Sequence, residues 1–249
     1  MINCLTNAEL SAKLETDGYV VIQICSPYQI ENIRKLYETV PADAESLFWS
    51  SSFLEDTEFK TELSEDIGQI LNHCVSKLLV GHKSLGSSFL TKFPGKDSIM
   101  PIHQDWTVVD ETKFGSYTIW MPLTDTDPNN GALQVIAGSH KLNAQLRSPS
   151  LPVAFEPIRG QLRPYLQSVN LKVGEAILFN HALMHASPPN LSNTPRVAVT
   201  FGFVPKEVSL CMYYNKDGNV QKYKMPQDMF IKYPQIRNEP QIGELEKEF

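Results

Sequence analysis

The chain has 249 residues, of which 42% are hydrophobic and 20% charged, and its formal net charge at pH 7 is -6. This composition is sufficient for a buried core and is typical of a globular protein. With a pI near 5.5, the chain lacks the basic field that attracts nucleic acid or an anionic membrane surface, so neither is expected as a partner.

The N-terminal part is predicted to alternate helices with a strand. Asn7 or Thr6 can cap a helix that stops at Gly18, and the β-branched run at 19–25 then predicts a strand. Ser26 opens a second helix, and a third is predicted through 63–78, because apolar residues recur at helical spacing in both. We expect these apolar stripes to form core.

From about residue 84 the chain changes to short strands separated by Pro, Gly, Asn and Asp turns. This spacing predicts a mainly β fold with flanking N-terminal helices, namely a double-stranded β-helix (jelly-roll, cupin-like) barrel. Residues 141–168 show little periodicity and predict a long excursion. A hairpin turning at 217–218 and a polar tail are expected after residue 205. The strand segments are SSFLTKF, SIMPIHQDW, GSYTIWMPL, ALQVIAG, SVNLKV, EAILFN and PRVAVTFGFV.

The whole chain, 1–249, is expected to form one domain. Its parts would be a helical region at about 1–83, the jelly-roll core at about 84–205, and a hairpin and tail at 206–249. Four cysteines stand far apart without a CxxC pair, which predicts reduced thiols in a cytoplasmic protein. The N-terminus lacks the basic start and apolar stretch of a signal peptide, so export is not expected.

The stretch PIHQDW at 101–106 places a histidine and an aspartate two positions apart. On a strand these two side chains share a face, so His103 and Asp105 would act together while Gln104 points away. Such a pair is common and by itself says little. A third candidate, His185, falls where a neighbouring strand is expected to end. Two histidines and one carboxylate form the facial triad typical of non-haem Fe(II) oxygenases, which leaves three positions open.

Arg196 begins the next predicted strand, eleven residues after His185. A guanidinium flanked by valines is costly to bury without a partner and suits a bidentate anion. A dicarboxylic cosubstrate such as 2-oxoglutarate would supply that anion, because its keto-acid end can chelate iron while its far carboxylate needs a fixed cation. Dioxygen would take the remaining position.

Three motifs in this order resemble the phytanoyl-CoA dioxygenase family of Fe(II)/2-oxoglutarate oxygenases. They are HQDW at 103–106, NNGALQVIAGSHK at 129–141 and FNHALMHASPPNLSNTPR at 179–196. The resemblance extends more loosely from DGYVVI to about residue 205. It implies a dioxygenase that hydroxylates an unactivated C–H bond of a small metabolite and releases succinate and CO2. The implied cofactors are Fe(II), 2-oxoglutarate and O2, with ascorbate as a candidate reductant.

The resemblance also implies two groups of site residues. The catalytic iron ligands would be His103, Asp105 and His185. The cosubstrate-binding residues would be Arg196, Ser187, Trp120 and Gln104. In the family, the positions of Arg196 and Ser187 hold the distal carboxylate. A role for Gln104 requires a twist or bulge in the strand, because strict alternation places it on the opposite face.

Other interpretations of these residues are weaker. His181 competes with His185, since a helical HALMH would place both on one face as in zinc proteases; however, no glutamate follows His181 and the preceding AILFN is strand-like. The acidic loop 125–131 lacks the glycine and glutamate positions of an EF-hand, so Gly131 is expected to supply a positive φ rather than a calcium turn. By the same resemblance, Asp105 argues against chlorination, because related iron halogenases carry a small residue there.

The prime substrate is expected to be a small molecule, either amino-acid-like or a biosynthetic intermediate, rather than a peroxisomal branched acyl-CoA. Three arginines in the excursion could meet an anionic group, although a solvated face is the favoured interpretation: Arg147, Arg159 and Arg163. The same chemistry can also desaturate, epoxidise or cyclise. A cupin-like metal enzyme or a ligand-binding barrel that does not use 2-oxoglutarate is the alternative, and neither would require Arg196.

Overall fold

The first two helices of the N-terminal part begin at predicted caps, whereas the third starts six residues before and ends three residues before the predicted range of 63–78. In the computed structural model, Asn7 accepts a hydrogen bond from the backbone of Leu10, and Gly18 ends the first helix at a φ of 82°. Ser26 and Gln29 form a capping box at the start of the second. The long helices are α1 (Ala8–Asp17), α2 (Pro27–Glu38) and α3 (Thr57–Val75). The structure describes all residues except 1–4, 42, 44–45, 77, 143–144 and 233–237.

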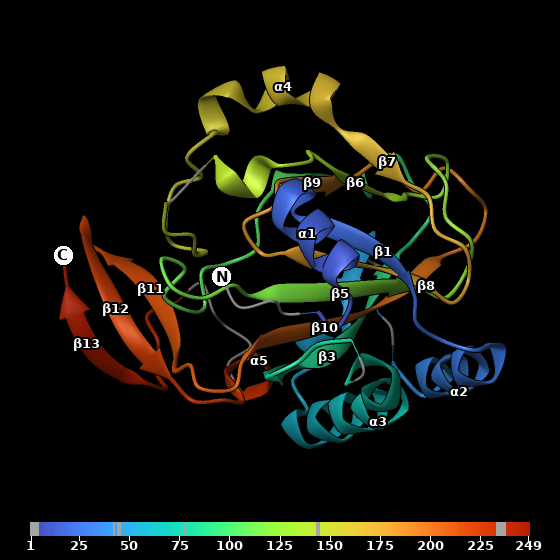
Figure 1. The fold of residues 1–249 in the computed structure, drawn as a ribbon, viewed down its shortest axis with the longest axis horizontal. Helices are drawn as coiled ribbons and strands as arrows, with labels where there is room; N and C mark the ends of the chain where they lie inside the picture. Colours follow the sequence, from blue (N-terminus) through green and yellow to red (C-terminus); the bar gives the residue numbers. More distant parts are fainter. Residues whose placement is uncertain (1–4, 42, 44–45, 77, 143–144, 233–237) are drawn as a thin grey trace.

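A six-stranded antiparallel sheet forms the larger wall of the fold, in the order β1-β8-β5-β10-β3-β2. Its strands are β1 (Tyr19–Gln23), β2 (Phe48–Ser50), β3 (His82–Lys92), β5 (Tyr117–Pro122), β8 (Glu175–Asn180) and β10 (Arg196–Pro205). A four-stranded antiparallel sheet, in the order β4-β9-β6-β7, faces it (Figure 1). Its strands are β4 (Met100–His103), β6 (Leu133–Val135), β7 (Gln167–Val169) and β9 (His185–Ser187). The predicted jelly-roll fold, mainly β with flanking helices, is confirmed.

Strand alternation sorts the side chains of the large sheet between two layers. Along β10, Val197, Val199 and Phe201 face α2 and α3, which cover the outer side of the sheet (Figure 1). The alternate residue Ala198 packs inward, in a cluster that includes Leu133 of the small sheet. Arg196 has the same parity as Ala198, so its side chain enters the space between the sheets.

The layer between the large sheet and α3 should contribute much of the stability. Ile67 of α3 is fully buried in that layer. Ile67→Ala is therefore expected to lower the free energy of unfolding by about 3 kcal/mol, because it removes apolar contacts and leaves a cavity. Urea denaturation measures the change. The exposed Glu65 on the same helix is the matched control, and Glu65→Ala should change stability by less than about 0.5 kcal/mol. Equal effects would contradict the assigned packing.

The excursion over 141–168 covers the outer face of the small sheet. Phe155 packs there with Ile102 of β4 and Ala186 of β9, and Figure 1 shows α4 above β9 and β6. Between residue 145 and the start of β7 at Gln167, the regular structure of the described excursion consists of helical elements of three or four residues. The short helical elements of the chain are η1 (Ser51–Phe53), η2 (Ser139–Lys141), η3 (Glu156–Ile158), α4 (Arg159–Leu162), η4 (Arg163–Tyr165) and α5 (Met229–Lys232).

The C-terminal hairpin is present, but part of the predicted polar tail is a strand. The turn lies at Asp217 and Gly218, both with positive φ. A third strand with the sequence ELEKE then pairs with the hairpin, and its high content of charged residues kept it from being recognised. The three strands are β11 (Leu210–Lys216), β12 (Asn219–Met225) and β13 (Glu244–Glu248).

The cysteines of the described residues form no disulfide. Cys25, Cys74 and Cys211 are free thiols, and Cys4 lies outside the described part. No described helix combines the length and the apolar character needed to cross a bilayer.

Candidate active site

His103 and His185 are brought together by strand pairing. His103 ends β4 and His185 begins β9, and the two residues are direct partners in the antiparallel register. Their ring centroids lie 4.1 Å apart. Asp105 follows two residues later, with its Oδ1 3.7 Å from Nε2 of His185. One potential ligand atom from each of these three residues lies within 4.8 Å of the other two, close enough to share one metal ion.

The route by which Asp105 reaches this cluster differs from the predicted one. β4 ends at His103, with an irregular register before it, so Asp105 does not share a strand face with His103. Instead, the backbone N–H of Asp105 donates to the carbonyl of His181 at 2.9 Å. The expectation that Gln104 points away is also wrong. Its buried amide donates to the carbonyl of Ala182 at 2.5 Å, and the residue lines the cavity.

The hydrogen bonds of both histidines leave the same ring nitrogen free. Nδ1 of His103 lies 2.9 Å from the carbonyl oxygen of Pro101, and Nδ1 of His185 lies 2.9 Å from that of Leu183. Because a carbonyl can only accept, each Nδ1 must carry the proton, and each Nε2 keeps its lone pair for a metal. Burial lowers the pKa of His103 to about 4, with a smaller contribution from His185, so His103 is neutral near pH 7.

A hydroxyl and an imidazole support the carboxylate of Asp105. Thr118 Oγ1 donates to Oδ2 of Asp105 at 3.4 Å and lies 3.0 Å from Nε2 of His181. Burial alone would raise the pKa of Asp105, but His185, His181 and other neighbours bring it below its usual value. The carboxylate is therefore ionised, as a metal ligand must be. The structure places His185 in the donor cluster and His181 behind it.

The donor cluster opens into a cavity of about 440 Å³ between the two sheets. Arg196 lines this cavity with only 2% of its surface exposed, and its guanidinium lies 5.0 Å from the ring centroid of Trp120. Among the described residues its Nε and Nη1 have no hydrogen-bond partner. Burial lowers its pKa to about 10, so the group stays charged at neutral pH. A buried cation without a partner is costly and marks a place for an anion.

Ser187 shares the cavity face of β9 with His185. The two residues are two positions apart on this short strand, so their side chains share a face, while Ala186 between them packs against the excursion. Ser187 and Trp120 both line the cavity with Arg196. The four cosubstrate-binding residues predicted from the sequence thus surround one cavity, together with the three predicted metal ligands.

A family model places the chain among known proteins. The model described as "Phytanoyl-CoA dioxygenase (PhyH)" matches residues 14–198, which is well over half of the chain. The chain belongs to the phytanoyl-CoA dioxygenase family. The similarity predicted from the HQDW and downstream motifs is thereby confirmed.

Individual relatives of this family member are distant. A phytanoyl-CoA dioxygenase of Arabidopsis thaliana is 28% identical over 148 residues, which cover 58% of this chain and 51% of the relative. Phytanoyl-CoA dioxygenase domain-containing protein 1 of Danio rerio is 27% identical over 147 residues, covering 56% of this chain and 50% of the relative. The chain therefore matches about half the length of these relatives.

Solved structures share the fold of this family member. HygX from Streptomyces hygroscopicus, with nickel, 2-oxoglutarate and hygromycin B bound, is 19% identical with a TM-score of 0.59, covering 81% of this chain and 88% of that chain. SnoK, a non-haem α-ketoglutarate-dependent carbocyclase from nogalamycin biosynthesis, is 17% identical with a TM-score of 0.60. The match covers 82% of this chain and 86% of SnoK. At these identities the comparison establishes the jelly-roll architecture.

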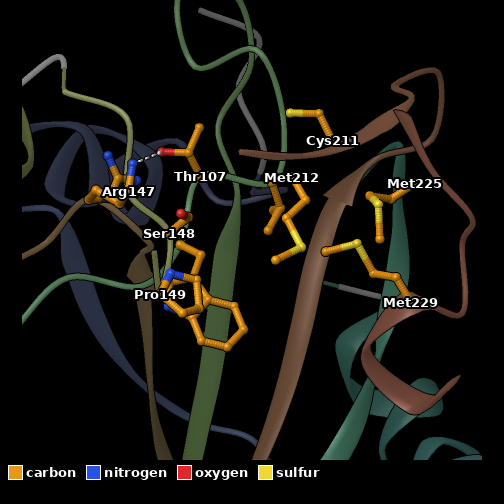
Figure 2. Close-up of a pocket in the computed structure, with 10 residues that line it drawn as sticks. Thr107, Arg147, Ser148, Pro149, Cys211, Met212, Met225 and Met229 are labelled. Carbon is orange, nitrogen blue, oxygen red and sulfur yellow. Dashed lines mark hydrogen bonds between the residues drawn. The ribbon is translucent and has the colours of Figure 1, made fainter. Parts of the chain in front are cut away.

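Arg147 is a functional candidate that the sequence misplaced. The solvated face favoured for the three arginines is wrong for this one, because it is 9% exposed and paired with Glu111 at 2.5 Å. Its Nε donates to the carbonyl of Asp105 at 2.7 Å. Figure 2 shows Arg147 beside Thr107, across a small pocket from Met212 and other methionines. Arg147 therefore joins the segment that contains Asp105, a predicted metal ligand, to the excursion. Arg163 is exposed, as expected.

Arg147→Met should weaken metal binding in this family member. Loss of the hydrogen bond to the Asp105 carbonyl leaves the ligand less well oriented, and loss of such outer support costs roughly tenfold in metal affinity. Anaerobic Fe(II) titration measures the effect, with thermal unfolding recorded alongside. The exposed Arg163 is the matched control from the same excursion, and Arg163→Met should leave the affinity unchanged. Equal Fe(II) affinities in the two variants would show that Arg147 does not orient Asp105.

Proposed function

We propose that the chain is a non-haem Fe(II)/2-oxoglutarate-dependent dioxygenase that hydroxylates an unactivated C–H bond of a small metabolite, with release of succinate and CO2. One observation supports this above the others: a single cavity contains a three-residue donor cluster and a buried guanidinium whose Nε and Nη1 have no hydrogen-bond partner among the described residues. A keto acid with a distant second carboxylate suits both features. A cupin-like enzyme or binding barrel without 2-oxoglutarate would leave the charge of Arg196 unexplained.

Each residue of the cavity has a defined task in this proposal. His103, Asp105 and His185 would hold the ferrous ion through two Nε2 atoms and one carboxylate oxygen. Bound there, iron would supply the redox chemistry that couples oxidation of a C–H bond by O2 to decarboxylation of 2-oxoglutarate. Arg196 and Ser187 would bind the distal carboxylate. Fixing both ends of the cosubstrate in the cavity would set its orientation before reaction.

The remainder of the cavity favours a neutral prime substrate. Its described lining outside the cosubstrate region combines serine and threonine hydroxyls with apolar and aromatic side chains such as Trp106 and Phe230. The charged side chains of that described lining are Asp105 and Arg196, which the proposal already uses. An amino-acid-like substrate would need a fixed partner for each of its charges. We therefore favour a neutral biosynthetic intermediate with hydroxyl-bonding groups over an amino acid or an acyl-CoA.

The fold relatives agree with a role in small-molecule biosynthesis. HygX was solved with hygromycin B, and SnoK is a carbocyclase of nogalamycin biosynthesis. We propose that this chain likewise acts on a biosynthetic intermediate. Hydroxylation, desaturation, epoxidation and cyclisation would give products of different mass and connectivity, so product analysis separates them.

Succinate formation tests the proposal directly. The protein is supplied with Fe(II), 2-oxoglutarate, O2 and ascorbate as reductant, and succinate is measured with and without a library of neutral metabolites. Asp105→Ala, which lacks a proposed ligand, is the matched control. We expect slow succinate formation that a substrate accelerates and that the control lacks. Substrate conversion without 2-oxoglutarate would favour the cupin-like alternative, and equal succinate in both proteins would refute the proposal.

A further inference from the structure

A fully buried lysine stands behind the cosubstrate end of the cavity. Lys92, the last residue of β3, is the direct cross-strand partner of Arg196 and is 0% exposed. Its ammonium lies 2.5 Å from Oγ of Ser187, 3.3 Å from the carbonyl oxygen of Ser187 and 2.7 Å from that of Pro188. Three donors thus meet three acceptors, and none of these acceptors is a carboxylate. Two cations side by side in a buried layer repel each other, so this arrangement requires a reason.

The surrounding backbone makes room for this lysine. Gly131, in the NNGALQV motif, has a φ of 83°, and a Cβ there would lie 2.7 Å from Cδ of Lys92 and 3.1 Å from the carbonyl oxygen of Pro188. Any side chain at position 131 would therefore displace the stem of Lys92. The side-chain amide of Asn190 donates to the backbone carbonyl of Lys92 at 2.9 Å. The glycine that the sequence assigns to a turn also provides the passage for Lys92.

The hydrogen bonds at Ser187 determine where its proton points. A hydroxyl has one proton to donate and can accept with its lone pairs. Because the charged ammonium has no lone pair, Oγ of Ser187 must accept from Lys92. Its own proton is then free for the cavity, which Ser187 and Arg196 both line.

We infer that Lys92 is a positioning residue for cosubstrate binding, which holds the Ser187 hydroxyl as a donor to the distal carboxylate of the keto acid. The inference rests on the proposed function, because it takes the anion beside Arg196 to be the distal carboxylate of 2-oxoglutarate. Lys92 does not itself line the cavity. It acts through Ser187, and its charge adds to that of Arg196 at the end where the anion binds.

The protonation state of Lys92 should determine the direction of the hydrogen bond between Lys92 and the Ser187 hydroxyl. Burial, with a smaller contribution from Arg196, lowers the pKa of Lys92 to about 7. A neutral Lys92 amine has a lone pair and can accept a hydrogen bond from the Ser187 hydroxyl. The hydroxyl proton would then point toward Lys92 and away from the cavity. Among the described neighbours of the Lys92 amine, Arg196 is the charged group. Ser187, Phe48 and Gly131, which also lie close to the lysine side chain, are neutral. A bound carboxylate favours the ammonium, so 2-oxoglutarate affinity should be constant below pH 7 and fall above it.

Comparison of two keto acids separates positioning from general structure. 2-Oxoglutarate has the distal carboxylate, and 2-oxopentanoate lacks it while keeping the chelating end. Kd values for both are measured anaerobically on the Fe(II)-loaded protein. Lys92→Met should raise the Kd for 2-oxoglutarate about tenfold and leave the Kd for 2-oxopentanoate nearly unchanged, since one charge-supported hydrogen bond is lost. Adding Ser187→Ala to Lys92→Met should have little further effect, because both act through one hydroxyl.

A second lysine on β3 provides the control for Lys92→Met. Lys83 lies on the same strand and also donates to a backbone carbonyl, so Lys83→Met should change neither Kd. If Lys92→Met does not fold, the pH profile of the wild-type protein provides the test. Weaker 2-oxoglutarate binding above pH 7, with no such trend for 2-oxopentanoate, would support the role. Equally weaker binding of both keto acids by Lys92→Met, or a 2-oxoglutarate affinity that does not change with pH, would overturn the role of Lys92 and leave the proposed function intact. Failure of the wild-type protein to bind either keto acid would overturn both the role of Lys92 and the proposed function.

Discussion

Replacement of Arg196 by methionine is expected to raise the Kd for 2-oxoglutarate about a hundredfold while the affinity for Fe(II) is retained. The guanidinium can make two charge-assisted hydrogen bonds to a carboxylate, and their loss amounts to roughly 3 kcal/mol. Methionine keeps an apolar stem of similar length beside Trp120. Anaerobic titration of the Fe(II)-loaded protein measures the Kd.

The same substitution should not destabilise the cosubstrate-free protein. Without an anion, Arg196 is a buried charge with two unpartnered donors in the described structure, and its removal relieves that cost. The free energy of unfolding in urea should therefore stay equal or increase, and 2-oxoglutarate should no longer stabilise the variant. Lys206→Met, which removes an exposed cation just beyond β10, is the control for loss of charge. Unchanged dependence on 2-oxoglutarate in Arg196→Met would remove Arg196 from the site.

Asp105→Asn is expected to abolish turnover and to weaken Fe(II) binding strongly. Loss of a residue that only supports a ligand costs roughly ten- to hundredfold in metal affinity, and loss of the ligand itself should cost more. The amide keeps the size of the carboxylate and its contact with Thr118, but it lacks the negative charge that a hard divalent cation prefers. Anaerobic Fe(II) titration and succinate formation measure the two effects. Stability without metal should change little, since the backbone hydrogen bond to His181 remains.

An exposed carboxylate provides the comparison for this variant. Asp66 lies on the solvent side of α3, so Asp66→Asn removes the same charge from the chain without touching the cavity. It should bind Fe(II) as the wild-type protein does. If Asp105→Asn also retained full affinity, the carboxylate would not be a ligand and the donor cluster would need another third member.

The parts of the fold that local chemistry determines were predictable. The caps at Asn7 and Ser26 and the turn at Asp217 follow from the preferences of single residues for one backbone conformation. The long strands follow from alternation and β-branched content. β9 could not be read as a separate strand, because its three residues owe their conformation to pairing with β4 and β6.

Long-range contacts account for what the sequence did not reveal about the site. Asp105 takes its position from a hydrogen bond to His181, seventy-six residues later, rather than from strand alternation. Arg147 is buried because Glu111 and the Asp105 carbonyl meet it. Lys92 carried no signal in its local sequence; the passage opened by Gly131 and the acceptors at Ser187 appear only once the strands pair.

One cavity is expected to bind ferrous iron at three residues and 2-oxoglutarate between that iron and Arg196. Anaerobic addition of Fe(II) and then 2-oxoglutarate to the metal-free protein, with visible absorption recorded, tests both expectations at once. We predict a charge-transfer band that saturates at equimolar 2-oxoglutarate and that is absent from Asp105→Asn. A protein that binds Fe(II) tightly but develops no such band with excess 2-oxoglutarate would show that the cavity does not bind the keto acid on the iron.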